Sequence, residues 1–264
     1  MSLLTAPLLR VGARGTHLDG QPLFRGGPDE LLDEMEALVA SGGRHLVMTP
    51  NVDQVLALRT DPRTAAAHRA ASLRIADGAP LVGLARLLGD QRIQRLTGAD
   101  LLGDVVARAA RNGWRVAIVG GAEGVSDDAA ARLRASSPGV RLVTVPFPFV
   151  RSVDDAGCRA VADALRVERP DVVFVCLGSP KQEAWFLEWR DRLPPGVYVG
   201  AGAAVEFAAG TRARAPRLVQ RLGGEWLWRL AQEPRRLTHR YLVRGPAFVG
   251  VVLGSLLAAR GRRS

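Results

Sequence analysis

The sequence has few of the residues on which several classes of protein depend. Among 264 residues there are only two cysteines, four histidines and one lysine. Cys158 and Cys176 cannot by themselves form a disulfide framework or a zinc site, and this cysteine usage suits a reducing compartment. His17, His45 and His68 show no metal-ligand spacing, and we expect structural or exposed positions for them.

Long apolar runs are also missing, so a conventional membrane span is not expected. The nearest candidate is the 13-residue run Ala247–Ala259, which lies between Arg244 and Arg260 and is too short to span. It predicts either a helix lying in a membrane interface or a buried core helix, and the two alternatives stay open. The first ten residues, MSLLTAPLLR, have no basic segment before their apolar run, so we do not expect a secretory signal.

Three common catalytic motifs are absent. No Gly-Lys-Ser/Thr triplet occurs, which excludes a P-loop. No Asp-x-Asp pair occurs, so a carboxylate-clamped metal for a sugar nucleotide lacks its usual sequence sign. The Gly-x-Ser-x-Gly elbow of serine hydrolases is missing as well.

What the chain does have is a strongly uneven distribution of charge. Residues 211–264 hold 12 arginines and 2 glutamates, whereas residues 1–210 hold 24 basic and 24 acidic residues. Hydrophobic residues make up 47% of the chain, enough for a sizeable core. We therefore expect an α/β domain over 1–210 and a basic helical appendage over 211–264, with an anionic partner.

Strand-like and helix-like segments alternate through the first 210 residues. The expected strands are 44–48, 73–76, 115–119, 140–145, 171–177 and 197–199. The expected helices include 98–112, 126–135, 154–166 and 183–190, with Ser126 as an N-cap. Apolar strands alternating with helices predict a Rossmann-like parallel sheet covered on both faces.

In such a sheet, ligands bind beyond the carboxyl ends of the strands. The segment Gly120–Gly124 follows a strand and precedes a helix, which suits either a phosphate-binding loop or a plain turn. A dinucleotide site would place an acidic residue about 20 positions later, and that zone, Val143–Phe147, contains none. This counts against an NAD-dependent enzyme.

Six motifs in order resemble the WecG/TagA/CpsF glycosyltransferase family. They are Thr49-Pro50-Asn51-Val52-Asp53, Ala76-Asp77-Gly78, Arg95-Leu96-Thr97-Gly98-Ala99-Asp100-Leu101, Gly178-Ser179-Pro180-Lys181-Gln182-Glu183, Gly200-Ala201-Gly202, and a tail comprising Arg214-Ala215-Pro216, Glu225–Leu230, Glu233–Leu237 and Arg240-Tyr241-Leu242. The resemblance covers roughly residues 20–243. It is specific for the family and not for a substrate.

The resemblance implies an inverting glycosyltransferase of cell-surface polysaccharide or teichoic-acid-type polymer synthesis. The donor would be a UDP-sugar carrying an N-acetylmannosamine-type hexosamine or a related hexose. The acceptor would be an undecaprenyl-diphosphate-linked sugar. The enzyme would work as a peripheral protein at the inner, cytoplasmic face of the cell membrane.

By position, the resemblance places the general base on Asp77. A sugar hydroxyl is a poor nucleophile until a base removes its proton, and such a base contributes about 10²–10⁴-fold. Thr49 and Asn51 match a polar pair beside it, although Asn51 could instead cap the next helix. Asp77 itself could be a turn aspartate before Gly78.

The remaining matched positions concern the donor and its diphosphate. Arg95 matches an arginine near the active site, with a surface ion pair to Asp100 as the alternative, and Gln182 matches a contact to the nucleotide sugar. Arg229 and Arg236 would hold the diphosphate, with Arg235, His239 and Arg240 nearby. Because arginines and helix dipoles can stabilise the leaving group, no metal or other cofactor is expected.

The basic tail also predicts contact with an anionic membrane surface. Juxtamembrane arginines are attracted to anionic lipid, and tryptophan and tyrosine settle at the interface. Trp226, Trp228 and Tyr241 are of these types, although the tryptophans could instead pack the appendage on the body. Two rival functions remain: a Rossmann-type nucleotide-dependent oxidoreductase and a basic nucleic-acid-binding protein. The aromatic helices and apolar end fit lipid better than a duplex, so no nucleic-acid partner is expected.

Overall fold

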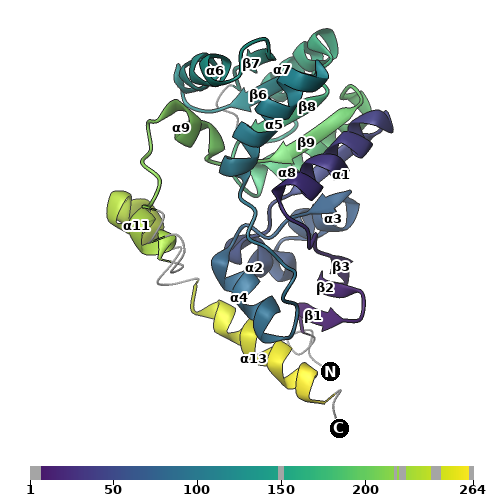
Figure 1. Ribbon diagram of the computed structural model, residues 1–264, viewed down its shortest axis with the longest axis vertical. Helices are drawn as coiled ribbons and strands as arrows, with labels where there is room; N and C mark the ends of the chain where they lie inside the picture. Colours follow the sequence, from purple (N-terminus) through teal and green to yellow (C-terminus); the bar gives the residue numbers. More distant parts are fainter. Residues whose placement is uncertain (1–6, 148–151, 217–218, 220–223, 239–244, 262–264) are drawn as a thin grey trace.

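The computed structural model describes residues 7–147, 152–216, 219, 224–238 and 245–261, except for the side chains of residues 225, 229 and 236. Its centre is a six-stranded sheet in which every neighbouring pair is parallel (Figure 1). The strands are β4 (Arg44–Met48), β5 (Leu73–Arg74), β6 (Arg115–Gly120), β7 (Arg141–Val145), β8 (Val172–Cys176) and β9 (Gly196–Gly200). Their spatial order is β5-β4-β9-β8-β6-β7. The predicted α/β architecture is therefore confirmed.

Helices cover both faces of this sheet. One face packs on α1 (Pro28–Ala40), α5 (Gly98–Asn112), α6 (Val125–Ser136) and α9 (Ala204–Ala209). The other packs on α3 (Pro62–Ala70), α7 (Ala156–Glu168) and α8 (Lys181–Trp189), which continues into the short helix η1 (Arg190–Arg192). Because both faces are covered, the central strands are apolar throughout; every residue of β8 is buried.

Helix α5 shows how the sequence sets element boundaries. Its N-cap is Thr97, whose side-chain oxygen accepts the backbone N–H of Asp100. Its apolar face is buried against the sheet, and its polar face is exposed. It ends at Gly113, which has a φ of 70° and so adopts the left-handed conformation that glycine tolerates best.

A smaller antiparallel sheet lies at the N-terminal end of the described chain. It consists of β1 (Leu9–Gly12), β2 (Gly15–Leu18) and β3 (Gln21–Pro22), in that order. Together with α2 (Val52–Thr60) and α4 (Ala79–Leu87), it encloses a third apolar cluster. None of these elements was among our predictions except the helix after Asn51.

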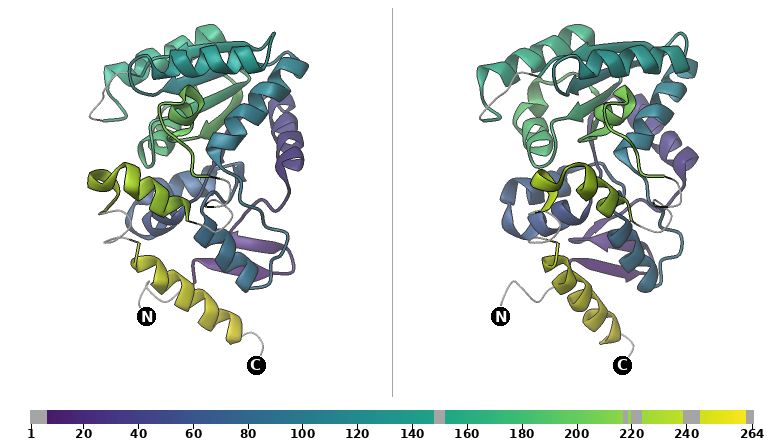
Figure 2. Two further views of the ribbon diagram at one scale, coloured as in Figure 1. Left: turned by 60° about the vertical axis from the view of Figure 1, so that its left-hand side comes forward. Right: turned by 90° about the vertical axis from the view of Figure 1, so that its left-hand side faces the viewer.

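The C-terminal part is helical. It contains α11 (Glu225–Gln232), α12 (Pro234–Thr238) and α13 (Ala247–Arg260). Figure 2 shows α13, in yellow, at the end of the molecule that also carries the small antiparallel sheet. Among the described residues, no helix combines the length and the apolar character needed to cross a bilayer.

Helix α13 contains the run 247–259, and its two faces differ in burial. One face is buried, because Phe248 and Val251 join the third apolar cluster with residues of β1 and α2. The other face is exposed: Val249, Leu253 and Leu257 retain 56%, 55% and 67% of their accessible surface. The helix packs on the body and still presents an apolar stripe.

Candidate functional site

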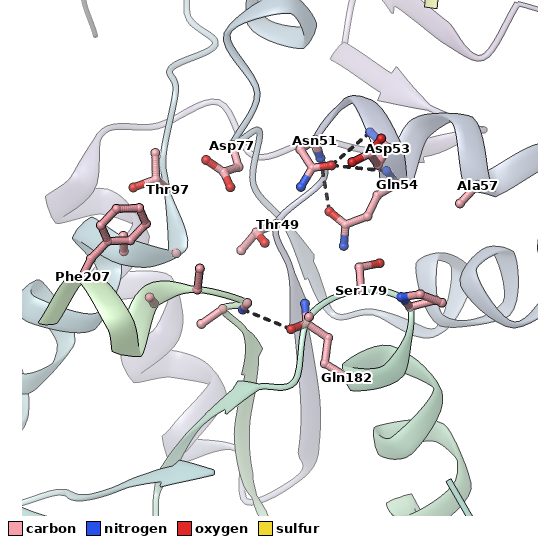
Figure 3. A pocket seen from close by; sticks show the side chains of 18 of the residues that line it. Thr49, Asn51, Asp53, Gln54, Ala57, Asp77, Thr97, Ser179, Gln182 and Phe207 are labelled. Atoms are coloured by element: carbon pink, nitrogen blue, oxygen red, sulfur yellow. Dashed lines mark hydrogen bonds between the residues drawn. The ribbon is translucent and has the colours of Figure 1, made fainter. Parts of the chain in front are cut away.

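A cavity of about 430 Å³ opens at the carboxyl edge of the large sheet (Figure 3). Its lining comes from the segments that follow β4, β5, β8 and β9, from the first turns of α2 and α5, and from the segment after α9. Its lining residues include Thr49, Asn51, Asp53, Gln54, Asp77, Thr97, Ser179, Gln182, Phe207, Arg212 and Arg214. Four of the predicted site residues, Thr49, Asn51, Asp77 and Gln182, therefore share one cavity.

Asp77 reaches the cavity from the segment after β5. Its backbone N–H donates to the carbonyl of Pro50 at 3.0 Å, which ties this segment to the one after β4. The two segments lie close together here, since a Cβ on Gly78 would be 3.4 Å from the Cα of Asn51. Asp77 is half-buried, and in Figure 3 its carboxylate lies on the wall of the cavity opposite Ser179 and Gln182.

Thr49 and Asn51 follow the end of β4. The Thr49 hydroxyl is buried and donates to the carbonyl of Gly200 at 2.8 Å, so it joins β4 to the end of β9. Asn51 is the N-cap of α2: its Oδ1 accepts the backbone N–H groups of Asp53 and Gln54 at 3.0 and 3.3 Å. The capping interpretation of Asn51 is confirmed.

Capping does not use the whole Asn51 side chain. The cap occupies the amide oxygen, while the amide nitrogen points into the cavity in Figure 3. An asparagine amide has one acceptor and two donor hydrogens, so the same residue can cap a helix and donate to a ligand.

Gln182 lies on the first turn of α8 and is only 3% exposed. Its Oε1 accepts the backbone N–H of Gly202 at 3.1 Å, and its Nε2 donates to Glu183 at 2.9 Å. The fit is close here: a Cβ at Gly200 would lie 2.6 Å from Nε2 of Gln182, so the amide would have to shift to admit it. These bonds hold the Gln182 amide firmly, so its second Nε2 hydrogen can be presented to the cavity.

Arg95 is not among the residues that line this cavity. Its proposed alternative partner, Asp100, forms an ion pair with Arg214. Burial acts to raise the pKa of Asp100, but the Arg214 guanidinium, the Thr97 hydroxyl and the charge of Arg95 together bring it below its usual value. The charge of Arg95 thus contributes to the positive electrostatic potential at the start of α5.

The predicted diphosphate-binding arginines of the tail cannot be placed with the same detail. The backbones of Arg229 and Arg236 lie in α11 and α12, but their side chains are outside the described structure. His239 and Arg240 also lie outside the described residues. Two other tail arginines, Arg212 and Arg214, do line the cavity.

A second cavity, of about 890 Å³, adjoins the first. It lies over the ends of β6, β7 and β8, where the chain leaves β6 toward one side of the sheet and β8 toward the other. Such a switch point is where open α/β sheets bind ligands. The two cavities share helix α9, because Glu206 lines the second and Phe207 lines the first.

The glycine segment after β6 borders this second cavity. Gly120 and Gly121 have φ values of 91° and 96°, which side chains rarely adopt, and a Cβ on Gly120 would lie 3.1 Å from the carbonyl oxygen of Cys176. Our prediction that Ser126 caps the following helix was wrong. The N-cap is Gly124 at a φ of 76°, and Ser126 is buried in the first turn.

Buried groups around the cavities show what each can bind. Oε2 of Glu206 is buried and has no hydrogen-bond partner within the described structure, so it can accept from a ligand N–H or O–H. Burial raises the pKa of the Cys176 thiol to about 12, so it behaves as an inert apolar side chain. Among the residues that the structure describes, no three His, Cys, Asp or Glu side chains gather as a metal site would require.

Two comparisons with known proteins bear on the family of the chain. A model of the glycosyl transferase WecG/TagA/CpsF family matches residues 17–262. The chain is 30% identical over 207 residues to the N-acetylglucosaminyldiphosphoundecaprenol N-acetyl-beta-D-mannosaminyltransferase of Bacillus spizizenii, covering 78% of each chain. These similarities decide against the oxidoreductase and nucleic-acid alternatives: the chain belongs to the WecG/TagA/CpsF family of glycosyltransferases.

Proposed function

We propose that the protein transfers an N-acetylmannosamine-type sugar from a UDP-sugar to an undecaprenyl-diphosphate-linked sugar, with inversion at the transferred carbon. The observation that carries this proposal is the position of Asp77 in a cavity with Asn51 and Gln182. The Bacillus relative, which is named for this type of transfer, supports the choice of substrates.

In this mechanism Asp77 is the general base. It takes the proton of the acceptor hydroxyl as that oxygen attacks the anomeric carbon and the bond to UDP breaks. Inversion requires attack from the face opposite the leaving group. Asp77 on one wall and the Gln182 amide on the opposite wall suit this geometry (Figure 3).

The nucleotide end of the donor would occupy the second cavity. Its glycine turn and the N-terminus of α6 suit an anion, and the unpartnered Oε2 of Glu206 suits the N–H of a pyrimidine base. Consecutive residues of α9 line the two cavities: Glu206 lines the second and Phe207 lines the first. A nucleotide sugar extending past these residues would place its base in the second cavity and its sugar in the first.

Charge on the departing diphosphate needs stabilisation, and we assign this to arginines without a metal. Arg212 and Arg214 already line the cavity. Arg229 and Arg236 on the following helices would complete the set. In this proposal residues 1–210 are the catalytic domain, and residues 211–264 are a basic helical appendage that completes the active site.

The same appendage would hold the enzyme on the inner face of the membrane, where a lipid-linked acceptor lies. Its net charge of +10 favours anionic lipid. Exposed apolar side chains on two helices, Trp226 and Leu227 on α11 and Leu253 and Leu257 on α13, suit insertion into the interface.

The decisive experiment measures UDP release from UDP-N-acetylmannosamine with a short-chain lipid-diphosphate N-acetylglucosamine, in EDTA. We expect acceptor-dependent release that falls at least about 100-fold in Asp77→Asn. The matched variant is Asp53→Asn, which makes the same change at another carboxylate lining the cavity and should cost less than about ten-fold. Equal loss in both variants would reject Asp77 as the base, and a protein that neither releases nor binds UDP would reject the proposed donor.

Membrane attachment has its own test. Sedimentation with phosphatidylglycerol vesicles at physiological salt should retain the protein, and phosphatidylcholine vesicles should retain much less. Leu253→Ser should weaken the retention, because that side chain is exposed in the apolar stripe of α13. Binding to duplex DNA under the same conditions, with no binding to vesicles, would refute the proposal.

A further inference from the structure

A buried acidic residue lies directly behind the proposed donor site. Glu183 follows Gln182 on the first turn of α8 and is 1% exposed. It lines neither of the two cavities, so no ligand in them reaches its carboxyl group directly. Burying an ionised acidic side chain costs free energy unless the group is hydrogen-bonded, and the cost is smaller for the neutral acid.

The Glu183 carboxyl joins two side-chain amides. Its Oε1 accepts from Nε2 of Gln54 at 2.7 Å and from Nε2 of Gln182 at 2.9 Å. Each of these amides in turn accepts a backbone N–H: Gln54 from Asn51 at 3.2 Å, and Gln182 from Gly202 at 3.1 Å. A continuous chain of hydrogen bonds therefore runs from the start of α2 to the segment after β9.

An acceptor at this position decides which way both amides face. A glutamine amide can turn end over end, exchanging its oxygen for its nitrogen. If Gln182 turned, its oxygen would oppose Oε1 of Glu183 and its NH₂ group would oppose the N–H of Gly202. Glu183 therefore fixes the orientation in which Gln182 presents an N–H to the cavity, and through Gln54 it also supports the turn that carries Asn51.

This role does not depend on whether the Glu183 carboxyl carries a proton. Burial raises the pKa of Glu183, although the hydrogen bonds from Gln182, Ser179 and Gln54 act in the opposite direction. Protonation would leave Oε1 as the acceptor for both amides, because a carbonyl oxygen has two lone pairs. A glutamine at 183 would offer the same carbonyl oxygen without a charge.

We propose that Glu183 is a positioning residue for the glycosyl donor: through hydrogen bonds and not through its charge, it sets the amide of Gln182 and the cap of α2 in the orientation that receives the UDP-sugar. This inference rests on the proposed function. It concerns a residue that touches neither donor nor acceptor.

Three variants test the idea. Glu183→Leu removes the acceptor and leaves two buried amide donors unpaired, so kcat/KM for the donor should fall at least about ten-fold. The KM for the acceptor should change less than about three-fold, because the effect lies on the donor side. Glu183→Gln should stay within about three-fold of the wild type, and Glu183→Asp, whose shorter side chain cannot reach both amides, should resemble the leucine variant.

Hydrogen exchange gives a readout that does not depend on turnover. The backbone amides of Asn51 and Gly202 should exchange faster in Glu183→Leu and unchanged in Glu183→Gln. If the leucine variant fails to fold, the aspartate variant carries the same comparison.

The outcomes separate this inference from the proposed function. A wild-type protein that neither releases nor binds UDP overturns the proposed function and with it the donor role of Glu183; the exchange data then decide whether Glu183 orients the amides. An active wild type with an equally active Glu183→Leu overturns the positioning role alone. A glutamine variant as impaired as the leucine variant would show that charge, and not orientation, is what position 183 supplies.

Discussion

Helix α13 offers the sharpest test of how the C-terminal part is attached. Its two faces differ: Phe248 is 8% exposed and packs in the third apolar cluster, whereas Leu253 is 55% exposed on the opposite stripe. We predict that Phe248→Ala loosens α13 and that Leu253→Ala does not, although both changes remove a large apolar side chain from one helix.

The magnitudes follow from burial. Removing a buried phenyl ring costs about 3–5 kcal/mol, because the transfer free energy is lost and a cavity remains. Besides Phe248, the fully buried residues of α13 are Val251 and Ser255, and burial of a valine contributes only about 1.5–3 kcal/mol. The loss should therefore act on the docking of α13. The half-exposed Leu253 should contribute within about 0.5 kcal/mol to stability.

Amide hydrogen exchange across residues 248–260 measures this directly. A loss of about 3 kcal/mol corresponds to about a hundred-fold faster exchange through local opening. Exchange in β8 should stay unchanged in the same sample, since that strand is buried in the centre of the large sheet. Protection of α13 within about three-fold of wild type in Phe248→Ala, or an equal effect of Leu253→Ala, would refute the packing argument.

Three further predictions concern stability and the site. Burial lowers the pKa of His68, whose Nε2 donates to the carbonyl of Leu18. The folded protein therefore keeps His68 neutral in a pH range where the unfolded chain, below pH 6.5, takes up a proton. The free energy of unfolding should fall as the pH drops below that value, with a shallower slope in His68→Gln. Arg214→Ala and Asp100→Asn should show a coupling of less than about 1 kcal/mol in a double-mutant cycle of urea unfolding, because the Asp100 side chain is 53% exposed; a larger coupling would contradict this. Asn51→Asp should keep the helix cap, with stability within about 0.5 kcal/mol, yet lower kcat/KM for the donor at least about ten-fold, since a donor N–H becomes a negative oxygen; full activity would exclude a ligand contact at this amide.

The large sheet could be predicted because its strands are short apolar runs between turn residues. Segments such as Val172–Cys176 and Val116–Gly120 are apolar on both faces, as strands of a doubly covered parallel sheet are. The boundaries moved by one or two residues; the helix expected from residue 154 begins at Ala156. Such shifts are ordinary at helix ends, where capping geometry decides.

The small antiparallel sheet could not be predicted in the same way. Its strands are two to four residues long, too short for a periodic pattern. Its stability comes from tertiary contacts, including Asp90, which accepts hydrogen bonds from Thr16 and Arg25 across more than 60 residues of chain. Burial acts to raise the pKa of Asp90, but these bonds and the Arg25 charge lower it overall.

The residues of the site likewise differ in whether the sequence alone could place them. Thr49, Asn51 and Asp77 could be placed together because each follows a strand of one parallel sheet, and those ends meet at one edge. Arg212 and Glu206 gave no comparable sign, because they reach the cavities only when the chain turns back after β9. Glu183 was visible as part of a motif, but its role depends on Gln54, which is 129 residues away in the sequence.

Helix α2 connects these parts of the molecule, and its contacts are of two kinds. Its first turn is fixed by polar bonds, through the cap at Asn51 and the bond from Gln54 to Glu183. Further along, Val55 and Leu58 pack in the apolar cluster that receives α13. Because the polar contacts do not pass through α13, loosening that helix should weaken membrane attachment without rearranging the cavity. Turnover of a short-chain acceptor free in solution should therefore survive a change in α13 that reduces binding to vesicles.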